Sequence, residues 1–221
     1  MNLGVLFSGG KDSTYAAFLA KKQGHEIACL ISIFSENPDS YMFHTPNIKL
    51  VKHQAKLMNL PIIIEKSKGI KEEELHDLER AINRAKQKYH IKGIVTGAIA
   101  SKYQLERVNK ICKKLGLKSI NQLWQKPELE YLNELINDKF KIIITSVSAY
   151  PLNDSLLGRV IDKSLIEELQ ILNQKYKIHI AGEGGEFETL VIDCPLFKEP
   201  LKVKRKNISG KDNSWRMEMT V

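Results

Sequence analysis

Residues 8–13 read Ser-Gly-Gly-Lys-Asp-Ser and combine residue types that bind phosphate. They directly follow an apolar run, where a buried strand would turn into a helix. Backbone N–H groups at the start of a helix attract anions, and glycines let the backbone approach a ligand closely. Lys11 adds a positive charge, and Ser8 and Ser13 add hydroxyl donors. The pattern predicts a phosphate site made of Ser8, Gly9, Gly10, Lys11, Asp12 and Ser13.

Asp12 is the unusual member of this set. A carboxylate beside a phosphate is repulsive unless a cation lies between them, so we expect Asp12 to act through Mg²⁺, directly or through water. A Walker A loop is excluded, because Val5 stands where it requires a glycine and Asp12 where it requires a hydroxyl. The dinucleotide fingerprint is excluded because the two glycines are adjacent. The alternative is a plain glycine turn with ordinary capping residues.

Strands and helices alternate along the first 120 residues. Apolar patterns predict strands over 2–7, 26–34, 61–65 and 93–97, and helices over 13–23, 48–58, 75–89 and 102–115. Asn47 and Ser101 are placed to cap helices, and Gly24 and Gly116 to end them. This alternation indicates an α/β fold with a parallel sheet covered on both faces. Ligands bind such sheets at the carboxyl ends of the strands, where residues 8–13 fall.

The second part of the chain is less regular. It contains helix patterns over 127–138 and 162–176, a strong strand over 140–149 and a short apolar strand over 177–181. We expect a smaller α/β domain here, so that residues 1–120 form the domain that carries the predicted phosphate site and residues 121–221 form a second domain.

Composition describes an ordinary globular chain of 221 residues with 43% hydrophobic residues and a net charge of +8. We interpret the excess charge as a solvated lysine-rich surface, with no stable nucleic-acid partner. No membrane span or leader is expected, so we predict a cytoplasmic protein, and a homo-oligomer is compatible with the sequence. Cys29, Cys112 and Cys194 lack metal or disulfide spacing and are expected to be buried free thiols.

The string SGGKDS resembles the PP-loop of the N-type ATP pyrophosphatases. The resemblance implies a HUP-like (adenine nucleotide alpha hydrolase-like) domain that cleaves ATP between its α and β phosphates and transfers AMP to an acceptor oxygen. Lys11, Asp12 and Ser13 become the expected catalytic residues. Because the second strand lies beside the first in such folds, Ser32 is expected near the adenine or ribose.

The loop after the fourth predicted strand is a second candidate for nucleotide contact. Gly97, Ala98 and Ser101 are small, and AMP would lie against their backbone. The alternative is that a helix start also needs small and capping residues.

A second unusual string, EGGEFET, occupies residues 183–189. Glu183, Glu186 and Glu188 crowd together, and because like charges repel, a cation is expected nearby. The alternative is a solvated acidic turn. With the segments at 97–108 and 157–162, this string resembles the diphthine–ammonia ligase family in its short archaeal form.

That resemblance implies ATP-dependent amidation of diphthine on elongation factor 2, with AMP and pyrophosphate as products. No cysteine-initiated glutaminase segment is visible, so free ammonium is the expected nitrogen donor. Gln122 stands where many relatives have proline.

Diphthine carries a trimethylammonium group, which carboxylates and aromatic faces recognise. We expect Glu186 or Glu188 to supply the carboxylate, and Phe187, Tyr103 or Trp124 an aromatic wall. The expected substrate-binding residues are Tyr103, Gln104, Arg107, Glu183, Glu186, Phe187, Glu188 and Thr189. His44 and Arg159 are weaker candidates, the first as a turn histidine and the second as a partner of Asp162.

Two other functions fit part of the pattern. One is a PP-loop enzyme that adenylates a tRNA base, such as a tRNA thiolase or a lysidine-type ligase, and the positive charge of the chain fits it. Thiolases usually recruit CxxC pairs, however, and these are absent here. A nucleotide-sensing module would bind ATP without splitting it, and the presence of both Lys11 and Asp12 argues against this.

Overall fold

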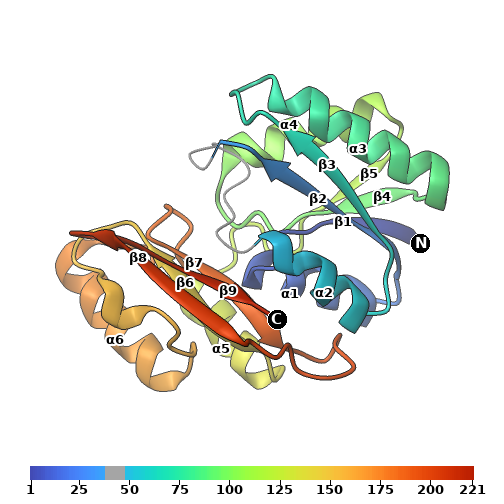
Figure 1. The fold of residues 1–221 in the computed structure, drawn as a ribbon. Helices are drawn as coiled ribbons and strands as arrows, with labels where there is room; N and C mark the ends of the chain where they lie inside the picture. The colour runs from blue at the N-terminus through green and yellow to red at the C-terminus, as the bar shows by residue number, and fades with distance from the viewer. Residues whose placement is uncertain (38–47) are drawn as a thin grey trace. The chain divides into compact units, whose positions relative to one another are not determined.

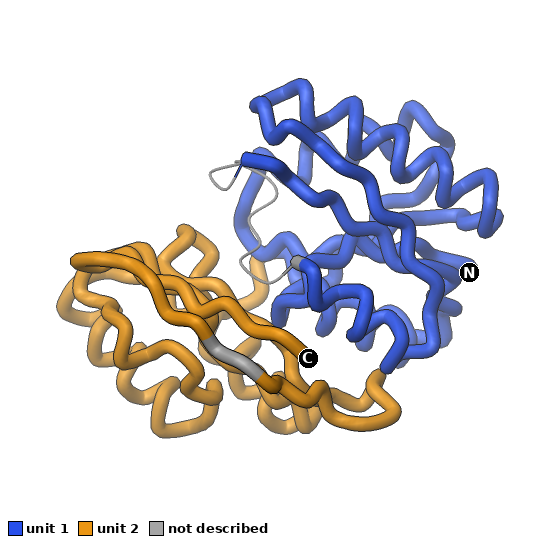
Figure 2. The backbone as a smooth tube through the Cα atoms, in the orientation of Figure 1, with its two compact units in different colours: residues 1–124 blue, residues 125–221 orange. Residues whose placement is uncertain are grey.

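The computed structural model describes residues 1–37 and 48–221, so Asn47 and His44 lie outside the described residues. The chain divides into two compact units, Met1–Trp124 and Gln125–Val221 (Figure 2). None of the helices in the described ranges is long and apolar enough to cross a membrane.

Unit 1 is built on a five-stranded parallel sheet with the order β3-β2-β1-β4-β5 (Figure 1). Its strands are β1 (Asn2–Leu6), β2 (Glu26–Ser35), β3 (Ile62–Ser67), β4 (Gly93–Val95) and β5 (Lys118–Ile120). Its helices are α1 (Lys11–Lys22), α2 (Val51–Leu57, after the 3₁₀ turn η1, Ile48–Leu50), α3 (Glu74–Tyr89) and α4 (Lys102–Lys114). The predicted parallel α/β fold is confirmed.

The core of unit 1 follows from the apolar spacing in its helices. Helices α3 and α4 bury one face each against the sheet, in a cluster that includes Leu78, Ile82, Ile111 and Cys112. Helices α1 and α2 lie together on the other face (Figure 1). Gly24 and Gly116 were predicted to end helices, and each lies two residues after the last residue of a helix, in the left-handed conformation that glycine tolerates best.

Unit 2 combines a four-stranded antiparallel sheet, in the order β7-β6-β9-β8, with two helices. The strands are β6 (Lys141–Val147), β7 (Phe187–Asp193), β8 (Arg205–Lys211) and β9 (Ser214–Thr220). The helices are α5 (Glu128–Asn137) and α6 (Lys163–Tyr176), and a 3₁₀ turn, η2, spans Asp154–Leu156. The two helices and β6 match the sequence prediction, whereas β7, β8 and β9 were not predicted.

The predicted strand over 177–181 is wrong, because this segment forms no strand. Its backbone N–H groups bond to side chains instead of to a neighbouring strand. His179 N donates to Glu186 Oε1 at 2.8 Å, and Ile180 N donates to Glu128 Oε2 at 2.8 Å. Apolar composition alone could not reveal that carboxylates would take these hydrogen bonds.

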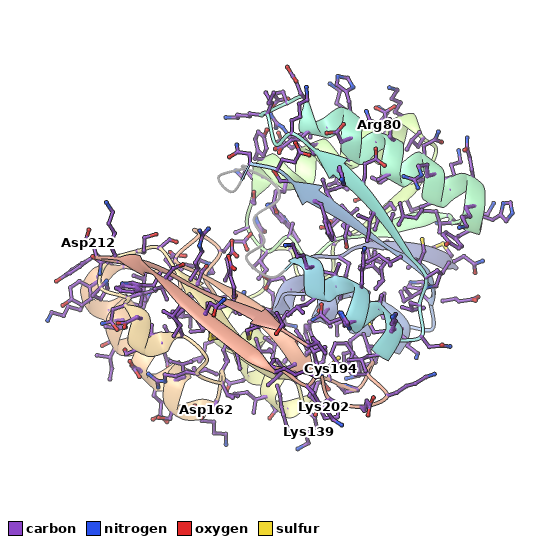
Figure 3. The ribbon with its side chains drawn as sticks, viewed as in Figure 1. Arg80, Lys139, Asp162, Cys194, Lys202 and Asp212 are labelled. Carbon is purple, nitrogen blue, oxygen red and sulfur yellow. The ribbon has the colours of Figure 1, made fainter. Side chains whose placement is uncertain are left out.

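The start of α6 corrects another expectation. Asp162, which is labelled in Figure 3, caps this helix. Its Oδ1 accepts a hydrogen bond from Leu165 N at 2.9 Å. Arg159, which was considered as its partner, donates instead to Glu168 Oε2 at 2.6 Å. The capping bond occupies the Asp162 carboxylate, and Glu168 lies within reach on the helix.

Candidate active site

Residues 8–10 lie in the turn between β1 and α1, and residues 11–13 begin α1, so the predicted order of strand, turn and helix is confirmed. Gly9 has a positive φ of 81°, a conformation that side chains with a Cβ rarely adopt. Ser13 Oγ accepts a hydrogen bond from Ser8 N at 3.2 Å and donates to Gly10 O at 3.3 Å. The hydroxyl therefore holds the turn closed around the first residues of α1, where the helix dipole favours an anion.

Lys11 and Asp12 form an ion pair at the start of α1. The Nζ of Lys11 lies 3.0 Å from Asp12 Oδ2. The lysine is buried, with 3% of its surface exposed, whereas the Asp12 side chain is 31% exposed. A buried ammonium needs such a partner, and the more exposed carboxylate keeps access to solvent and to cations.

Gln54 of α2 is a site residue that the sequence analysis missed. It is fully buried, and its Nε2 donates to Gly9 O at 3.0 Å. A Cβ on Gly9 would collide with Gln54 Oε1, so the glycine and the glutamine fit each other. A signal was present, because a polar residue stands here between the apolar positions Val51 and Ala55 of the helix.

The loop after β4 packs directly on the start of α1. A Cβ on Gly97 would lie 2.6 Å from the carbonyl carbon of Asp12 and 2.7 Å from Ser13 N. Only glycine therefore permits this approach of the two backbones. Sequence reasoning placed Gly97 at the nucleotide edge of the sheet, and the structure brings it into contact with residues 8–13.

Other members of this loop have structural partners. Ala98 is buried, and its N–H donates to Thr96 Oγ1 at 3.2 Å, while that hydroxyl donates to Asn121 Oδ1 at 2.9 Å. Ser101 caps α4, with its Oγ accepting from Gln104 N at 3.3 Å. The capping alternative considered for Ser101 is thus realised.

Ser32 supports the turn from below. It is 1% exposed, and its Oγ donates to Phe7 O at 2.6 Å. A buried hydroxyl bonded to Phe7, the residue before the turn, positions the backbone there. That Ser32 approaches the adenine or ribose through its side chain or its backbone stays a prediction.

Tyr103 and Arg107 form a cluster with Glu72, which the sequence analysis did not single out. Glu72 Oε1 accepts from the Tyr103 hydroxyl at 2.9 Å and from Arg107 Nη2 at 2.6 Å. The Arg107 guanidinium stacks on the Tyr103 ring, 3.4 Å from its centroid. The hydrogen bond from Arg107 lowers the pKa of Glu72, with help from Tyr103. One face of the predicted aromatic wall is thus already covered by a cation.

In unit 2 the three glutamates of EGGEFET have different surroundings. Glu186 bends back toward its own loop, with Oε1 bonded to His179 N and Oε2 buried without a hydrogen-bond partner among the described residues. Glu183 and Glu188 are half-buried, and Glu188 pairs with Ser146 across the sheet. Thr189 is half-buried and pairs with Ile144.

The aromatic candidates also differ. Phe187 is buried, with 2% of its surface exposed. Trp124 and Tyr103 belong to unit 1 and are half-buried. That one of these rings forms an aromatic wall stays a prediction.

A glycine-rich anion loop at the carboxyl end of the central strand of a parallel sheet defines unit 1 as a nucleotide-binding α/β domain of the PP-loop class. The chain as a whole belongs to the diphthamide synthase family. The profile for the diphthamide synthase N-terminal domain matches residues 1–119, and that for the C-terminal domain matches residues 126–220.

Several proteins named diphthine–ammonia ligase are similar to this chain. The one from Mus musculus is 36% identical over 225 residues, covering 92% of this chain and 83% of that protein. The Bos taurus protein is 34% identical, with coverage of 94% and 85%. The Schizosaccharomyces pombe protein is 35% identical over 92% of this chain, which spans 36% of that longer protein.

Two solved structures are also similar. The predicted subunit of tRNA methyltransferase from Methanocaldococcus jannaschii has a TM-score of 0.44 and 18% identity, with 88% of this chain and 98% of that chain covered. The U34-tRNA thiolase NcsA from Methanococcus maripaludis has a TM-score of 0.41 and 17% identity, with 84% and 70% covered.

Proposed function

We propose that this protein is an ATP-dependent diphthine–ammonia ligase that amidates the diphthine carboxylate of elongation factor 2 with ammonium. The observation that carries the proposal is the match of both family profiles, one to each part of a chain whose first part bears a PP-loop. Proteins named for this activity that are covered over more than four fifths of their length support it. A translation factor as substrate supports a cytoplasmic location.

Unit 1 is the proposed ATP-binding domain. In the reaction, an oxygen of the diphthine carboxylate attacks the α-phosphorus of ATP, the bond to the α,β-bridging oxygen breaks, and pyrophosphate leaves with the electron pair. Ammonia then attacks the acyl carbon of the acyl-adenylate, AMP leaves, and the surplus proton passes to solvent. Residues 8–13 would hold the pyrophosphate, with Lys11 and the backbone N–H groups of the turn stabilising the charge that develops on it.

Asp12 is the proposed Mg²⁺ ligand. Within residues 1–37 and 48–221, no three His, Cys, Asp or Glu side chains gather into a metal site. Mg²⁺ in nucleotide enzymes typically binds through one or two carboxylates together with substrate phosphates, and the 31% exposed carboxylate of Asp12 fits that requirement. When bound, the ion would supply neutralisation of phosphate charge. Ser13 and Ser8 would complete the turn, and Gly97, Ala98 and Ser101 would shape its neighbouring wall.

Unit 2 is the proposed substrate-binding domain. Glu183, Glu186 and Glu188 would give the negative potential that the trimethylammonium group requires, since that cation has no N–H to donate. Phe187 would contribute by packing the strand that carries Glu188 and Thr189. In unit 1, Tyr103, Gln104 and Arg107 remain proposed contacts for the protein substrate, and Ser32 a support for the nucleotide site.

The test is incubation of the purified protein with ATP, Mg²⁺, ammonium and diphthine-bearing elongation factor 2. We expect AMP and pyrophosphate only when that acceptor is present, and a mass change at the modified histidine that matches conversion of a carboxylate to an amide. AMP released on addition of bulk tRNA would favour the tRNA-modifying alternative. ATP binding without AMP formation with either acceptor would favour a nucleotide sensor.

A further inference from the structure

Residues 179–181 of unit 2 are held in place by hydrogen bonds to side chains instead of by sheet pairing. We refer to residues 182–186, which lead into β7, as the acidic loop. Ahead of it, the three consecutive N–H groups of His179, Ile180 and Ala181 donate to Glu186 Oε1 at 2.8 Å, Glu128 Oε2 at 2.8 Å and His179 Nδ1 at 3.2 Å. Glu128 belongs to the first turn of α5, far away in sequence.

The hydrogen bonds of the His179 ring indicate which of its two nitrogens carries the proton. Because Nδ1 accepts from Ala181 N, it carries no proton, so the proton of the neutral imidazole is on Nε2. Nε2 lies 3.3 Å from Glu128 Oε1. Glu128 thus uses one oxygen for the histidine ring and the other for the backbone of Ile180, and it links α5 to the segment that precedes the acidic loop.

Glu186 closes the loop from the other side. Its Oε1 accepts from His179 N, and its backbone carbonyl accepts from Ser148 N at 2.8 Å. Its Oε2 is buried without a hydrogen-bond partner in the described part of the chain. A Cβ on Gly184 would lie 2.8 Å from Glu186 Oε1, so the carboxylate lies under the turn that Gly184 forms. This carboxylate is therefore directed into the loop.

We propose that Glu128 and His179 are positioning residues for substrate recognition. They fix Glu186 as the internal anchor of the acidic loop, and through it they set the positions from which Glu183 and Glu188 contribute negative potential toward the trimethylammonium group. The inference deepens the proposed function and rests on it. It assigns different tasks to three glutamates that the sequence alone presents as equivalent.

The physical basis is the cost of an unpaired buried donor. Removing the Glu128 carboxylate leaves the Ile180 N–H and the His179 Nε2–H without their acceptor, so the segment must rearrange to find water. The rearrangement would carry His179 N away from Glu186 Oε1 and release the anchor. Substrate recognition would suffer, while the nucleotide residues of unit 1 would keep their own contacts.

The experiment compares Glu128→Ala with Glu130→Ala and Glu128→Gln. Glu130 is the matched control, because it lies in the same first turn of α5, is exposed and pairs only loosely with Lys126 at 3.7 Å. For Glu128→Ala we expect the KM for diphthine-bearing elongation factor 2 to rise about 10-fold and the KM for ATP to stay within about twofold. Glu128→Gln keeps one oxygen acceptor and should recover part of the loss.

A second readout does not depend on activity. Amide hydrogen exchange should accelerate in a peptide covering residues 178–187 of Glu128→Ala, with the peptide covering β6 unchanged and no change in Glu130→Ala. Unchanged exchange at 178–187 would overturn the positioning role, as would faster exchange combined with an unaltered KM for the protein substrate. If the wild-type protein fails to amidate diphthine, the proposed function itself falls, and with it the assignment of Glu183 and Glu188.

Discussion

The candidate sites of the two units are suited to ligands of opposite charge, and they are built from different chemical groups. In unit 1 the candidate phosphate site consists mostly of backbone, held by the small contacts of Gly9 and Gly97 and by one buried lysine. In unit 2 the candidate cation site consists of glutamate side chains, and one of them, Glu186, is bonded to the backbone of a segment that Glu128 holds. An anion can be bound by the backbone N–H groups that every residue except proline carries, whereas a cation without N–H donors is bound by the side chains of carboxylates and aromatic residues.

The charge of the molecule follows the same division. Unit 1 contains 20 lysines and arginines against 11 aspartates and glutamates, and unit 2 contains 14 against 15. The whole excess of +8 therefore comes from unit 1, which has a net charge of +9, while unit 2 has −1. A positive field suits a domain proposed to bind a polyphosphate, and a slightly negative one suits a domain proposed to bind trimethylammonium.

The largest effect is expected for Lys11→Ala in unit 1. Loss of the ammonium removes the one buried cation beside the phosphate turn among the described residues, and we expect kcat for AMP formation to fall by about 10³-fold. The control is Lys21→Ala, an exposed lysine of the same helix, which should keep its activity. A Lys11→Ala protein with near wild-type AMP formation would show that the turn does not hold the reacting phosphates.

The cysteines distinguish the two units without reference to function. All three are buried and free, as predicted, and burial raises the pKa of Cys29 and Cys194 to about 12 and that of Cys112 to about 11. At pH 8 alkylation in the folded protein should therefore be about 100-fold slower than in the unfolded chain at Cys112 and about 1,000-fold slower at Cys29 and Cys194.

The same shifts set a pH dependence of stability. Above the ordinary thiol pKa of 9.0 the unfolded chain loses protons that the folded chain keeps, so the free energy of unfolding should decrease as the pH rises past about 9.

In pulse alkylation under mild denaturant, Cys29 and Cys112 of unit 1 should react at one common rate and Cys194 of unit 2 at another, since each unit has its own core. A single common rate would mean that the units open in one step.

A smaller effect is expected from adding one methyl group in each unit. In Gly97→Ala the new Cβ meets the backbone of Asp12 and Ser13, which cannot move cheaply, and we expect a loss of about 1–3 kcal/mol with a higher KM for ATP. In Gly184→Ala it meets the flexible carboxylate of Glu186, so the loss should not exceed about 1 kcal/mol.

The functional readouts of these two variants should also differ. Gly184→Ala should change the KM for the protein substrate and spare that for ATP. Thermal denaturation and steady-state kinetics measure both effects. Equal stability losses, or an ATP effect in Gly184→Ala, would contradict the contrast between a backbone-built and a side-chain-built site.

Much of unit 1 could be predicted from its sequence because its signals are local. Alternating strand and helix patterns, the glycines that end helices and the string at residues 8–13 each depend on neighbours along the chain. Ser32 shows the limit of this reasoning, since its place beside the turn was predicted but its hydrogen bond to Phe7 O depends on how β1 and β2 pair.

Unit 2 was harder to predict because its sheet joins distant strands. Strands β8 and β9 carry polar residues at many positions, and β7 pairs with β6 across a long separation in sequence. The segment before the acidic loop was mistaken for a strand because the partners of its N–H groups are side chains from elsewhere. The pattern of residues within a segment does not reveal hydrogen-bond partners that are distant in sequence.

The sequence by itself predicted a phosphate-binding turn, since the types and spacing of residues 8–13 already indicate an anion site with a lysine and a carboxylate. The reaction class followed from the resemblance of this string to the PP-loop. Only the tertiary structure decided which residues support that turn and which glutamates of unit 2 differ from one another. Gln54 reaches Gly9, and Glu128 reaches Ile180, across chain separations that no motif spans. Hydrogen bonds depend on distance in space, and that distance is set by the packing of whole helices and sheets.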